Sequence, residues 1–345
     1  MKIGYLYTSD DHDYHEALCM IANAKGIDYF VFRLSDVNTE DMTINGLFWN
    51  QAKEGLHRRK TGYPEIVDSR VMRRVHDEAY KSLSSHCLIS GVSLYDKQYI
   101  FELINKSPYS NYLINSHEYQ EAALEKYLEC YGEIIVKPIR GNKGRGVCKL
   151  SKAEELYAVT THDFTELLNQ NEYKAKYGDE FLAAGSLIQP YLNLSANDGS
   201  PFDVRVNVHR GKKGKWVRIG KMIRLAKKEG LVSNIAGGGY LLSRGINRFF
   251  ENEVNCDPKK INSEIKEIAT KIPDVVQGGY VNKIQTLGFD IGINRDNGDV
   301  KIIEVNGNPA IFHPIQLKTI FTKFDYYEYL YENIDSLMKN QIGLQ

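Results

Sequence analysis

The sequence predicts an α/β protein made of several lobes, the first of which is a doubly wound α/β domain. Its N-terminal part alternates strand-like and helix-like segments, as strand-helix-strand units do. Its 345 residues are enough for two or three separately packed units. Hydrophobic residues make up 42% and charged residues 26%, which is ordinary for a soluble globular protein. We therefore expect the whole chain to fold.

The N-terminal segment contains the elements of a doubly wound domain, whose ligands bind at the carboxyl ends of the strands. Gly26 is expected to end the first helix, because glycine adopts the backbone conformation that stops helices. The expected elements are a strand at Ile3–Tyr7, a helix at Tyr14–Ala24, a strand at Tyr29–Leu34, an irregular polar segment at Asn45–Pro64, a strand at Glu65–Asp68 and a helix from Arg70.

The middle and C-terminal segments predict further helices and strands. Ser116 is expected to cap a helix, and Ser151 with Glu154 has the pattern of a capping box for another. The glycine-rich turn at 141–146 leads into a strand, whereas a P-loop turn would lead into a helix. The expected elements are helices at Lys97–Asn105 and Ser116–Glu129 and strands at Glu133–Pro138, Val147–Leu150, Ser186–Pro190, from Asp203, Trp216–Arg224, Phe289–Asn294 and Val300–Asn306.

The last two strands form a hairpin that carries oxygen ligands. A three-residue loop, Asp296-Asn297-Gly298, joins them, which places Asp290 opposite Glu304. Glu304 and Asn306 share a face because strand side chains alternate, and Asp290 lies on the same face. Two carboxylates side by side on an otherwise apolar face are expected to cost stability without a cation. Two carboxylates and an amide suit Mg²⁺ bound together with nucleotide phosphates. The alternative is a solvated acidic hairpin without a ligand.

The glycine-rich turn combines backbone freedom with basic side chains. Lys143, Gly144, Arg145 and Gly146 follow the strand that contains Lys137. Glycine lets amide N–H groups approach phosphate oxygens, and lysine or arginine supplies the opposite charge. A glycine-rich surface hairpin would have a similar sequence. Lys137 is more informative, because a cation in an apolar strand needs an anionic partner.

Two further segments carry polar residues with two possible roles. Asp203 and Arg205 project from one face of a strand, and Arg224 can join them from the returning strand. These three residues are either phosphate contacts or a structural ion pair. Asn234 precedes a glycine run and is either a ligand of the site or a turn residue.

Another strand ends in a hinge-like segment. Gln189, Pro190, Tyr191 and Leu192 follow one another there. Their backbone groups are available to the edge of an adenine ring. A plain connector between two lobes would have the same sequence.

Taken in order, these motifs resemble the ATP-grasp superfamily over residues 97–314. Within it, the sequence is most similar to the endospore coat-associated YheC/YheD-like branch. The segments that carry this resemblance are FDVRV at 202–206, SNIAGG at 233–238, GFDIGI at 288–293, DYHE at 13–16 and Asp96-Lys97.

The resemblance implies an ATP-grasp fold of three parts: an N-terminal α/β domain at 1–95, a central lobe at 96–190 and a C-terminal lobe at 191–345. The implied cofactors are ATP and two Mg²⁺ ions, for which Mn²⁺ can substitute. One departure from related families is Ala310, where glycine is more common. The implied roles are phosphate contacts for Lys97 and Lys137, adenine contacts for 189–192, metal binding for Asp290, Glu304 and Asn306, and positions around the γ-phosphate for Arg205, Arg224 and Asn234.

The expected activity is that of a carboxylate–amine ligase, which activates a carboxylate as an acyl phosphate and passes it to an amine such as an amino acid. The acid is a small molecule or a peptide. Two alternatives stay open, a kinase-like phosphotransferase on the same fold and a non-catalytic coat protein that retains an ATP site.

Charge and cysteine content limit the partners and the compartment. Basic and acidic residues balance at 44 each, so no nucleic acid or membrane partner is expected. The five cysteines are scattered and form no CxxC pair, as in reduced cytoplasmic proteins. The N-terminal segment lacks the long apolar stretch of a signal peptide, and we expect a cytoplasmic protein. Homo-oligomerisation is left open.

Overall fold

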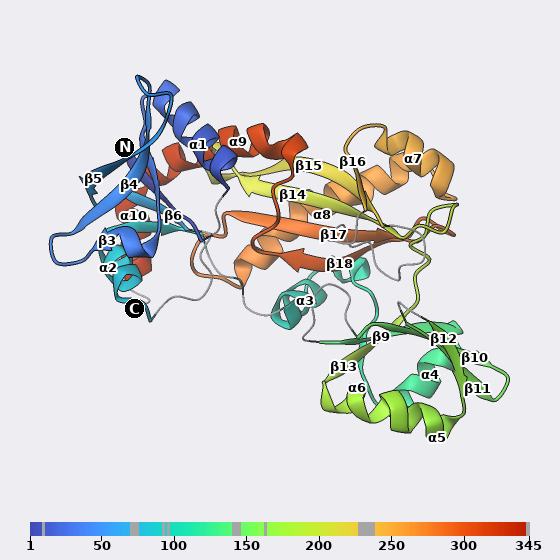
Figure 1. Ribbon diagram of the computed structural model, residues 1–345. Helices are drawn as coiled ribbons and strands as arrows, with labels where there is room; N and C mark the ends of the chain where they lie inside the picture. The colour runs from blue at the N-terminus through green and yellow to red at the C-terminus, as the bar shows by residue number, and fades with distance from the viewer. Residues whose placement is uncertain are drawn as a thin grey trace.

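The computed structural model describes residues 1–8, 11–69, 76–91, 94, 97–139, 146–161, 164–226 and 239–342. Within these residues the strands form three separate sheets of seven, six and five strands. Figure 1 shows the N-terminal sheet at the left, the five-stranded sheet in the middle and the six-stranded sheet at the lower right. The first strand and the last helix lie at the same end of the molecule.

The N-terminal sheet is doubly wound, as predicted, because helices cover both of its faces. β2, β1, β6 and β7 run parallel in that order. Helices α1, α9 and α10 pack on one face and α2 on the other. The strands are β1 (Lys2–Leu6), β2 (Asp28–Phe32), β3 (Val37–Asn38), β4 (Thr43–Asn50), β5 (Gly55–Gly62), β6 (Ile66–Ser69) and β7 (Leu88–Ser90). The helices are α1 (His12–Ala24), α2 (Glu78–His86), α9 (Gln316–Glu332) and α10 (Ile334–Ile342).

Local signals in the sequence explain where these helices begin and end. Asp11 accepts a hydrogen bond from the backbone N–H of Tyr14 and caps α1. Gly26, with a φ of +70°, follows the end of α1 as expected. Asp77 caps α2 in the same way. The start of the predicted helix from Arg70 lies outside the described residues.

The segment 45–64 forms part of a β-hairpin, and the prediction of an irregular segment was wrong. β4 pairs antiparallel with β5 along the whole of both strands. β5 lies at the sheet edge and buries few apolar side chains, so its sequence resembles that of a polar loop. Its basic residues are paired individually: Arg58 with Asp36, Arg59 with Asp28 and Lys60 with Asp41.

The C-terminal helices complete the core of the N-terminal sheet. Phe324 and Tyr327 of α9 are buried against Tyr29 of β2. A buried ion pair joins the same parts of the chain, because Nζ of Lys323 lies 2.5 Å from Oδ2 of Asp68 at the end of β6. The hydroxyl of Tyr327 donates a hydrogen bond to the same carboxylate. The two ends of the sequence therefore fold as one unit.

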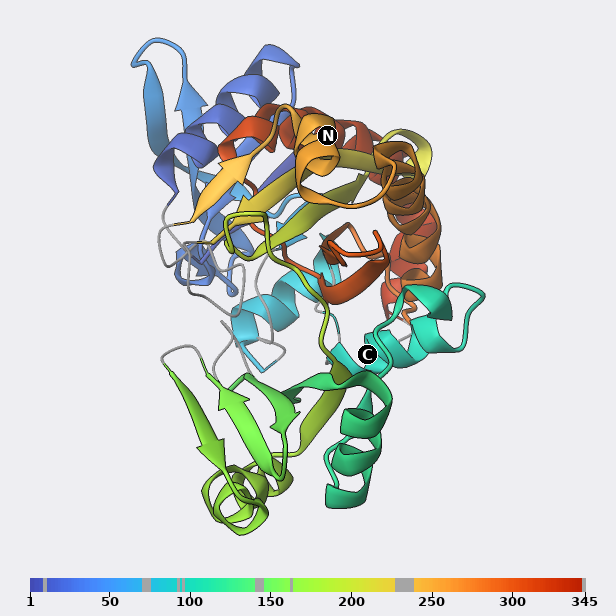
Figure 2. The same ribbon diagram turned by 90° about the vertical axis from the view of Figure 1, so that its right-hand side faces the viewer.

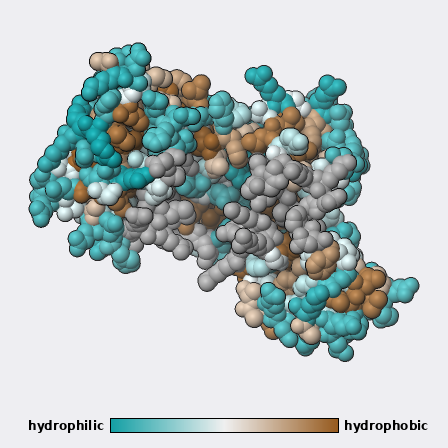
Figure 3. Space-filling model, viewed as in Figure 1, coloured by the Kyte–Doolittle hydropathy of each residue, from teal (hydrophilic) through white to brown (hydrophobic). Residues whose placement is uncertain are grey.

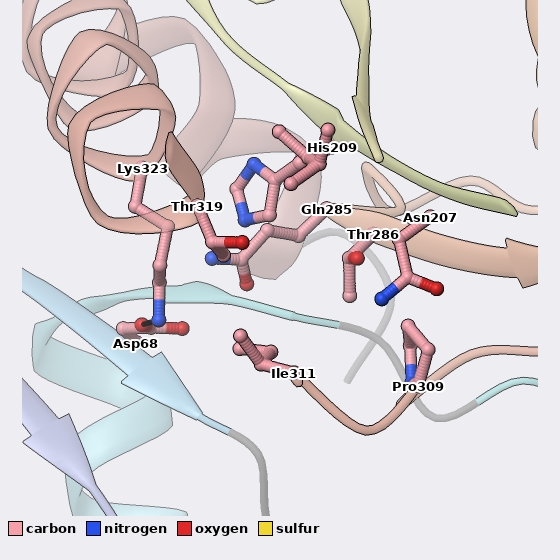
Figure 4. A pocket seen from close by; sticks show the side chains of 10 residues that line it. Asp68, Asn207, His209, Gln285, Thr286, Pro309, Ile311, Thr319 and Lys323 are labelled. Atoms are coloured by element: carbon pink, nitrogen blue, oxygen red, sulfur yellow. Dashed lines mark ion pairs between the residues drawn. The ribbon is translucent and has the colours of Figure 1, made fainter. Parts of the chain in front are cut away.

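A small polar cavity lies beside this ion pair, between α9 and the five-stranded sheet (Figure 4). Asn207, His209 and Gln285 line its other side. Its volume is about 20 Å³, which fits one water molecule and no substrate. Oδ1 of Asp68 and Oδ1 of Asn207 find no hydrogen-bond partner within the described residues. The cavity is thus a buried polar junction between the two ends of the fold.

The central lobe is an antiparallel sheet with helices on one face, and it is set apart from the rest (Figure 2). Its strands, in spatial order, are β12 (Thr165–Leu168), β11 (Leu156–Thr160), β10 (Cys148–Ala153), β9 (Glu133–Pro138), β13 (Ser186–Pro190) and β8 (His117–Glu118). Its α-helices are α4 (Glu121–Tyr131), α5 (Gln170–Tyr173) and α6 (Asp179–Ala183).

Two helix starts predicted in this lobe were wrong. Ser116 caps no helix, because β8 pairs with β13 directly after it and α4 begins at Glu121. Ser151 and Glu154 form no capping box, because β10 continues through Ser151 into a hairpin with β11. Glu154 occupies the turn with a φ of +57°. In both places strand pairing outweighs a local helix-start signal.

The C-terminal lobe is an antiparallel sheet with a long helix against one face. Its strands, in spatial order, are β16 (Tyr240–Leu242), β15 (Trp216–Leu225), β14 (Phe202–Arg210), β17 (Thr286–Ile293) and β18 (Val300–Asn306). The helices α3 (Lys97–Asn105), α7 (Ile246–Glu253) and α8 (Pro258–Gly278) join this lobe. Val204, Val206 and Val208 of β14 are buried in its core. Asp203 and Arg205 alternate with them and lie on the opposite face.

The loop after β18 packs closely on that opposite face because glycine leaves room for it. A methyl group added at Gly288 would lie 2.5 Å from Cβ of Pro309. The side-chain amide of Asn207 donates a hydrogen bond of 3.0 Å to the carbonyl of Ala310 in the same loop. The backbone φ of Ala310 is not positive, so the loop does not need glycine at this position.

Gly288→Ala is expected to lower the free energy of unfolding by about 1–3 kcal/mol, because the new methyl group overpacks the contact with Pro309. Gly278→Ala is the matched control, since a methyl group there meets no atom within 4 Å. Differential scanning calorimetry of both variants checks this. Equal melting temperatures for the two variants would contradict the close approach.

The described helices include none that is long and apolar enough to cross a bilayer. On the face shown in Figure 3 most of the surface is hydrophilic, and the apolar patches are small. The cysteines at 19, 87, 130, 148 and 256 are all unpaired.

Candidate nucleotide and metal site

A cleft of about 940 Å³ lies between the central and C-terminal lobes. Six of the residues proposed to bind the nucleotide line it, and they come from α3, β9, the end of β13 and the segment after it. These residues are Lys97, Lys137, Gln189, Pro190, Tyr191 and Leu192. Residues far apart in the sequence thus meet in one space of a size suited to a nucleotide.

The hinge segment is fixed by contacts that the sequence does not reveal. The side-chain amide of Gln189 is buried and donates a hydrogen bond of 2.7 Å to Oγ of Ser116. The backbone N–H of Tyr191 donates to the carbonyl of Glu133 at 3.0 Å and is not free for an adenine edge. Nζ of Lys149 lies 4.2 Å from the centre of the Tyr191 ring. Apolar side chains also line the cleft, among them Phe101, Leu113 and Ile303, and none of these three was predicted from the sequence.

Two lysines bring positive charge to the cleft next to the metal hairpin. Nζ of Lys97 lies 3.1 Å from Oε1 of Glu304. Burial lowers the pKa of Lys137 to about 8; the carboxylate of Glu304 opposes this shift, and the ammonium of Lys97 adds to it. Lys137 is therefore largely charged at neutral pH and loses its proton in the mildly alkaline range.

Binding of ADP is expected to weaken as the pH rises from 7 to 9.5. The pKa of Lys137 is about 8. At a pH below this value Lys137 is positively charged and attracts a phosphate group, and at a higher pH it loses this charge. Lys137→Met should bind ADP about tenfold more weakly at pH 7 and lose most of the pH dependence. Calorimetric titration across this range checks both effects. An unchanged pH profile in Lys137→Met would assign the dependence to another group.

The polar face of the C-terminal sheet carries a buried ionic network. Arg205 donates to both carboxylate oxygens of Asp290, through Nε to Oδ1 and through Nη2 to Oδ2 at 3.1 Å. Arg224 donates to Asp203 through Nε at 2.6 Å, and its Nη2 also lies 2.9 Å from Oδ2 of Asp290. Burial lowers the pKa of Arg224, but these two carboxylates outweigh it and raise the pKa above its ordinary value. Asp203 therefore contacts an arginine of the candidate site through two hydrogen bonds.

The metal hairpin has the predicted register. Asp290 pairs with Glu304, and a bulge next to Asp290 corrects for a loop that is longer than expected. Gly298 in this loop has a φ of +72°. The donor set of Asp290, Glu304 and Asn306 consists of hard oxygen and amide groups, which fits Mg²⁺. The described residues hold no cluster of three or more acidic, histidine or cysteine side chains, so this mixed set is the candidate.

One assumption about this hairpin needs correction. The sequence suggested that two neighbouring carboxylates on an apolar face cost stability without a metal ion. In the structure Arg205 and Arg224 neutralise Asp290, and Lys97 neutralises Glu304. Each of the two carboxylates therefore has a basic partner without a metal.

Four predicted residues lie outside the described part of the chain, namely Asn234, Lys143, Gly144 and Arg145. Gly146 is described; it has a φ of +71°, and a methyl group there would lie 3.0 Å from Cγ of Pro138. Asn207 was not among the site residues predicted from the sequence. Its position two residues after Arg205 on the same strand was the available signal.

The three sheets with a cleft between two lobes form an ATP-grasp fold. A solved structure with this arrangement is N5-carboxyaminoimidazole synthetase from Staphylococcus aureus complexed with ADP. It is 13% identical, with a TM-score of 0.50, over 93% of this chain and 75% of that chain.

The chain belongs to the YheC/D-like ATP-grasp family, whose sequence model matches residues 88–332. The endospore coat-associated protein YheC of Bacillus subtilis (strain 168) is 23% identical over 329 residues, which cover 90% of this chain and 89% of YheC. The alpha-aminoadipate–LysW ligase LysX of Saccharolobus solfataricus is 24% identical over 188 residues, which cover 53% of this chain and 50% of LysX.

Proposed function

We propose that the protein is an ATP-dependent carboxylate–amine ligase that works through an acyl phosphate and releases ADP and phosphate. The observation that carries this proposal is the single cleft lined by the two lysines and the hinge, which adjoins the hairpin through the contact between Lys97 and Glu304. Membership of the ATP-grasp family supports it, because most members are ligases of this kind. The similarity to LysX, which is named as a ligase, also supports this proposal.

The chain's own residues would supply binding and charge neutralisation. Lys97 and Lys137 would hold phosphate oxygens, and the hinge at 189–192 would hold the adenine. Arg205 and Arg224 would face the charge that develops when the carboxylate attacks the γ-phosphate. Asp203 would keep Arg224 in place.

Asp290, Glu304 and Asn306 would hold Mg²⁺, which supplies charge stabilisation at the phosphates. Attack on the γ-phosphate uses the carboxylate of the substrate. No nucleophile from the protein is required, and positioning of the two reactants provides much of the rate. The scheme therefore assigns no role to the cysteines.

Nucleotide binding is the first test. Mg-ATP at saturation should raise the melting temperature by several degrees, because a ligand at about 100 times its Kd stabilises a protein by about 2.7 kcal/mol. Mg-GTP at the same concentration serves as the comparison for the adenine contacts. Absence of any shift with ATP would favour a coat protein without a working site, a reading that the name of YheC keeps open.

The reaction class is the second test. Amino acids, short peptides and other carboxylic acids, each with and without an amine, should be screened for ADP release. Ligation predicts phosphate release that depends on both an acid and an amine. A stable phosphorylated product formed without an amine would identify a phosphotransferase on the same fold.

A further inference from the structure

We propose that the divalent cation binds this site only weakly ahead of the nucleotide, because two arginines pair with Asp290 until a polyphosphate draws Arg205 away. The empty site is then an anion site, and it becomes a metal site when phosphate groups arrive. This inference rests on the proposed function, since it concerns the order in which Mg²⁺ and ATP bind.

Both carboxylate oxygens of Asp290 have an arginine partner. Oδ1 accepts from Nε of Arg205, and Oδ2 accepts from Nη2 of Arg205 at 3.1 Å and lies 2.9 Å from Nη2 of Arg224. The side chain of Asp290 is 9% exposed, so solvent screens this pairing weakly. A cation that binds Asp290 therefore competes with these arginine contacts.

The charges around the hairpin also oppose a lone cation. Within the linked network around Asp290 and Glu304, four basic side chains face three carboxylates. The basic residues are Lys97, Lys137, Arg205 and Arg224, and the acids are Asp203, Asp290 and Glu304. This network by itself carries a net positive charge, which favours a polyphosphate over Mg²⁺ that comes without one.

The two arginines are held differently, which shows which of them can move. Arg224 is anchored by Asp203, to which it donates through both Nε and Nη2. The two hydrogen bonds of the Arg205 guanidinium both go to Asp290. A phosphate oxygen can thus draw Arg205 away from Asp290, while Asp203 keeps Arg224 in place. This exchange frees Oδ1 of Asp290 for the metal, while Arg224 keeps its contact with Oδ2.

Electron paramagnetic resonance of Mn²⁺ tests the binding order on the unaltered protein. With Mn²⁺ alone, the spectrum should contain the free-ion signal and at most a weak protein-bound signal. Addition of ADP should produce a protein-bound signal distinct from that of Mn-ADP without protein. A protein-bound signal of equal intensity before ADP is added would overturn the proposal.

Arg205→Gln tests the cause, because glutamine removes the charge and keeps a polar side chain. This variant should bind Mn²⁺ without nucleotide at least about tenfold more tightly than the unaltered protein, as expected when a neighbouring like charge is removed. Arg218→Gln is the matched control, since Arg218 lies on β15 outside the network and is exposed. Equal Mn²⁺ affinities of the two variants would overturn the proposal. If Arg205→Gln does not fold, the spectra of the unaltered protein decide.

The same samples separate this inference from the proposed function. ADP in the presence of EDTA should still raise the melting temperature, because the arginines and lysines receive the phosphates without a metal. If ADP binds but Mn²⁺ binds equally well without it, the binding order is wrong and the nucleotide site stands. If ADP and ATP fail to bind under every condition, the proposed function fails.

Discussion

Glu304→Ala is expected to abolish turnover while leaving the fold intact. Glu304 would hold the metal that balances the phosphates, and loss of such a group lowers kcat by about 10³-fold. Its ion-pair partner Lys97 is 47% exposed, so that ammonium stays in contact with solvent when the carboxylate is removed. ADP release with an active acid and amine, measured beside a thermal melt, checks both parts. Full activity in this variant would remove the hairpin from the mechanism.

A matched control for Glu304 lies in the loop of the same hairpin. Asp296 accepts hydrogen bonds from the side-chain amide of Asn193 at 3.1 and 3.2 Å, away from the arginine network. Asp296→Asn should therefore keep its activity and its ADP-dependent Mn²⁺ signal. Glu304→Ala should lose both. A similar loss in the two variants would indicate damage to the hairpin and no specific effect on the metal.

Lys323→Met is expected to lower the free energy of unfolding by about 3–5 kcal/mol, because it leaves the Asp68 carboxylate buried without a counter-charge. The exposed fractions of the two side chains are 3% for Lys323 and 0% for Asp68. Asp68→Asn combined with Lys323→Met should recover much of the loss, since no buried charge is left. Urea unfolding of the single and double variants measures this.

An exposed ion pair provides the comparison. Lys152 pairs with Glu125, and their side chains are 45% and 32% exposed. Lys152→Met should change the free energy of unfolding by less than about 1 kcal/mol. If Lys323→Met were as mild as Lys152→Met, the buried pair would contribute little to the joining of the two chain ends.

The same ion pair predicts a loss of stability in acid. Burial alone would raise the pKa of Asp68, but its contacts with Lys323 and Tyr327 outweigh burial and hold the pKa below its ordinary value. A carboxyl group whose pKa is lowered by folding stabilises the fold above its unfolded pKa of about 3.9. This stabilisation disappears as the pH falls further. Melting temperatures of Asp68→Asn should depend less on pH below 5 than those of the unaltered protein.

Alternation and spacing in the sequence were sufficient to predict several parts of the fold. The strand at β9, the helix α3 and the pairing of Asp290 with Glu304 depend on neighbours in the sequence, and these predictions were confirmed. Asp203 and Arg224 likewise meet across one short hairpin. Local patterns determine such features because the partners are joined by a few residues of chain.

Other features depended on contacts between distant segments. Strand β5 has a polar sequence, and it is defined by its pairing with β4, which in turn pairs with β2. Ser116 was expected at a helix start, but it accepts a hydrogen bond from Gln189, a residue 73 positions away. Local propensities are too weak to outweigh such tertiary contacts.

For this protein, the sequence by itself predicted which residues could hold a nucleotide and a metal. It allowed this prediction because the spacing of acidic, lysine and arginine residues along strands and turns sets which side chains share a face. The tertiary structure alone decided how these charges are paired. The pairing of Arg205 with Asp290, of Lys97 with Glu304 and of Lys323 with Asp68 joins residues 85 or more positions apart. Electrostatic energies depend on distance in space, which the folded chain sets and a sequence pattern does not.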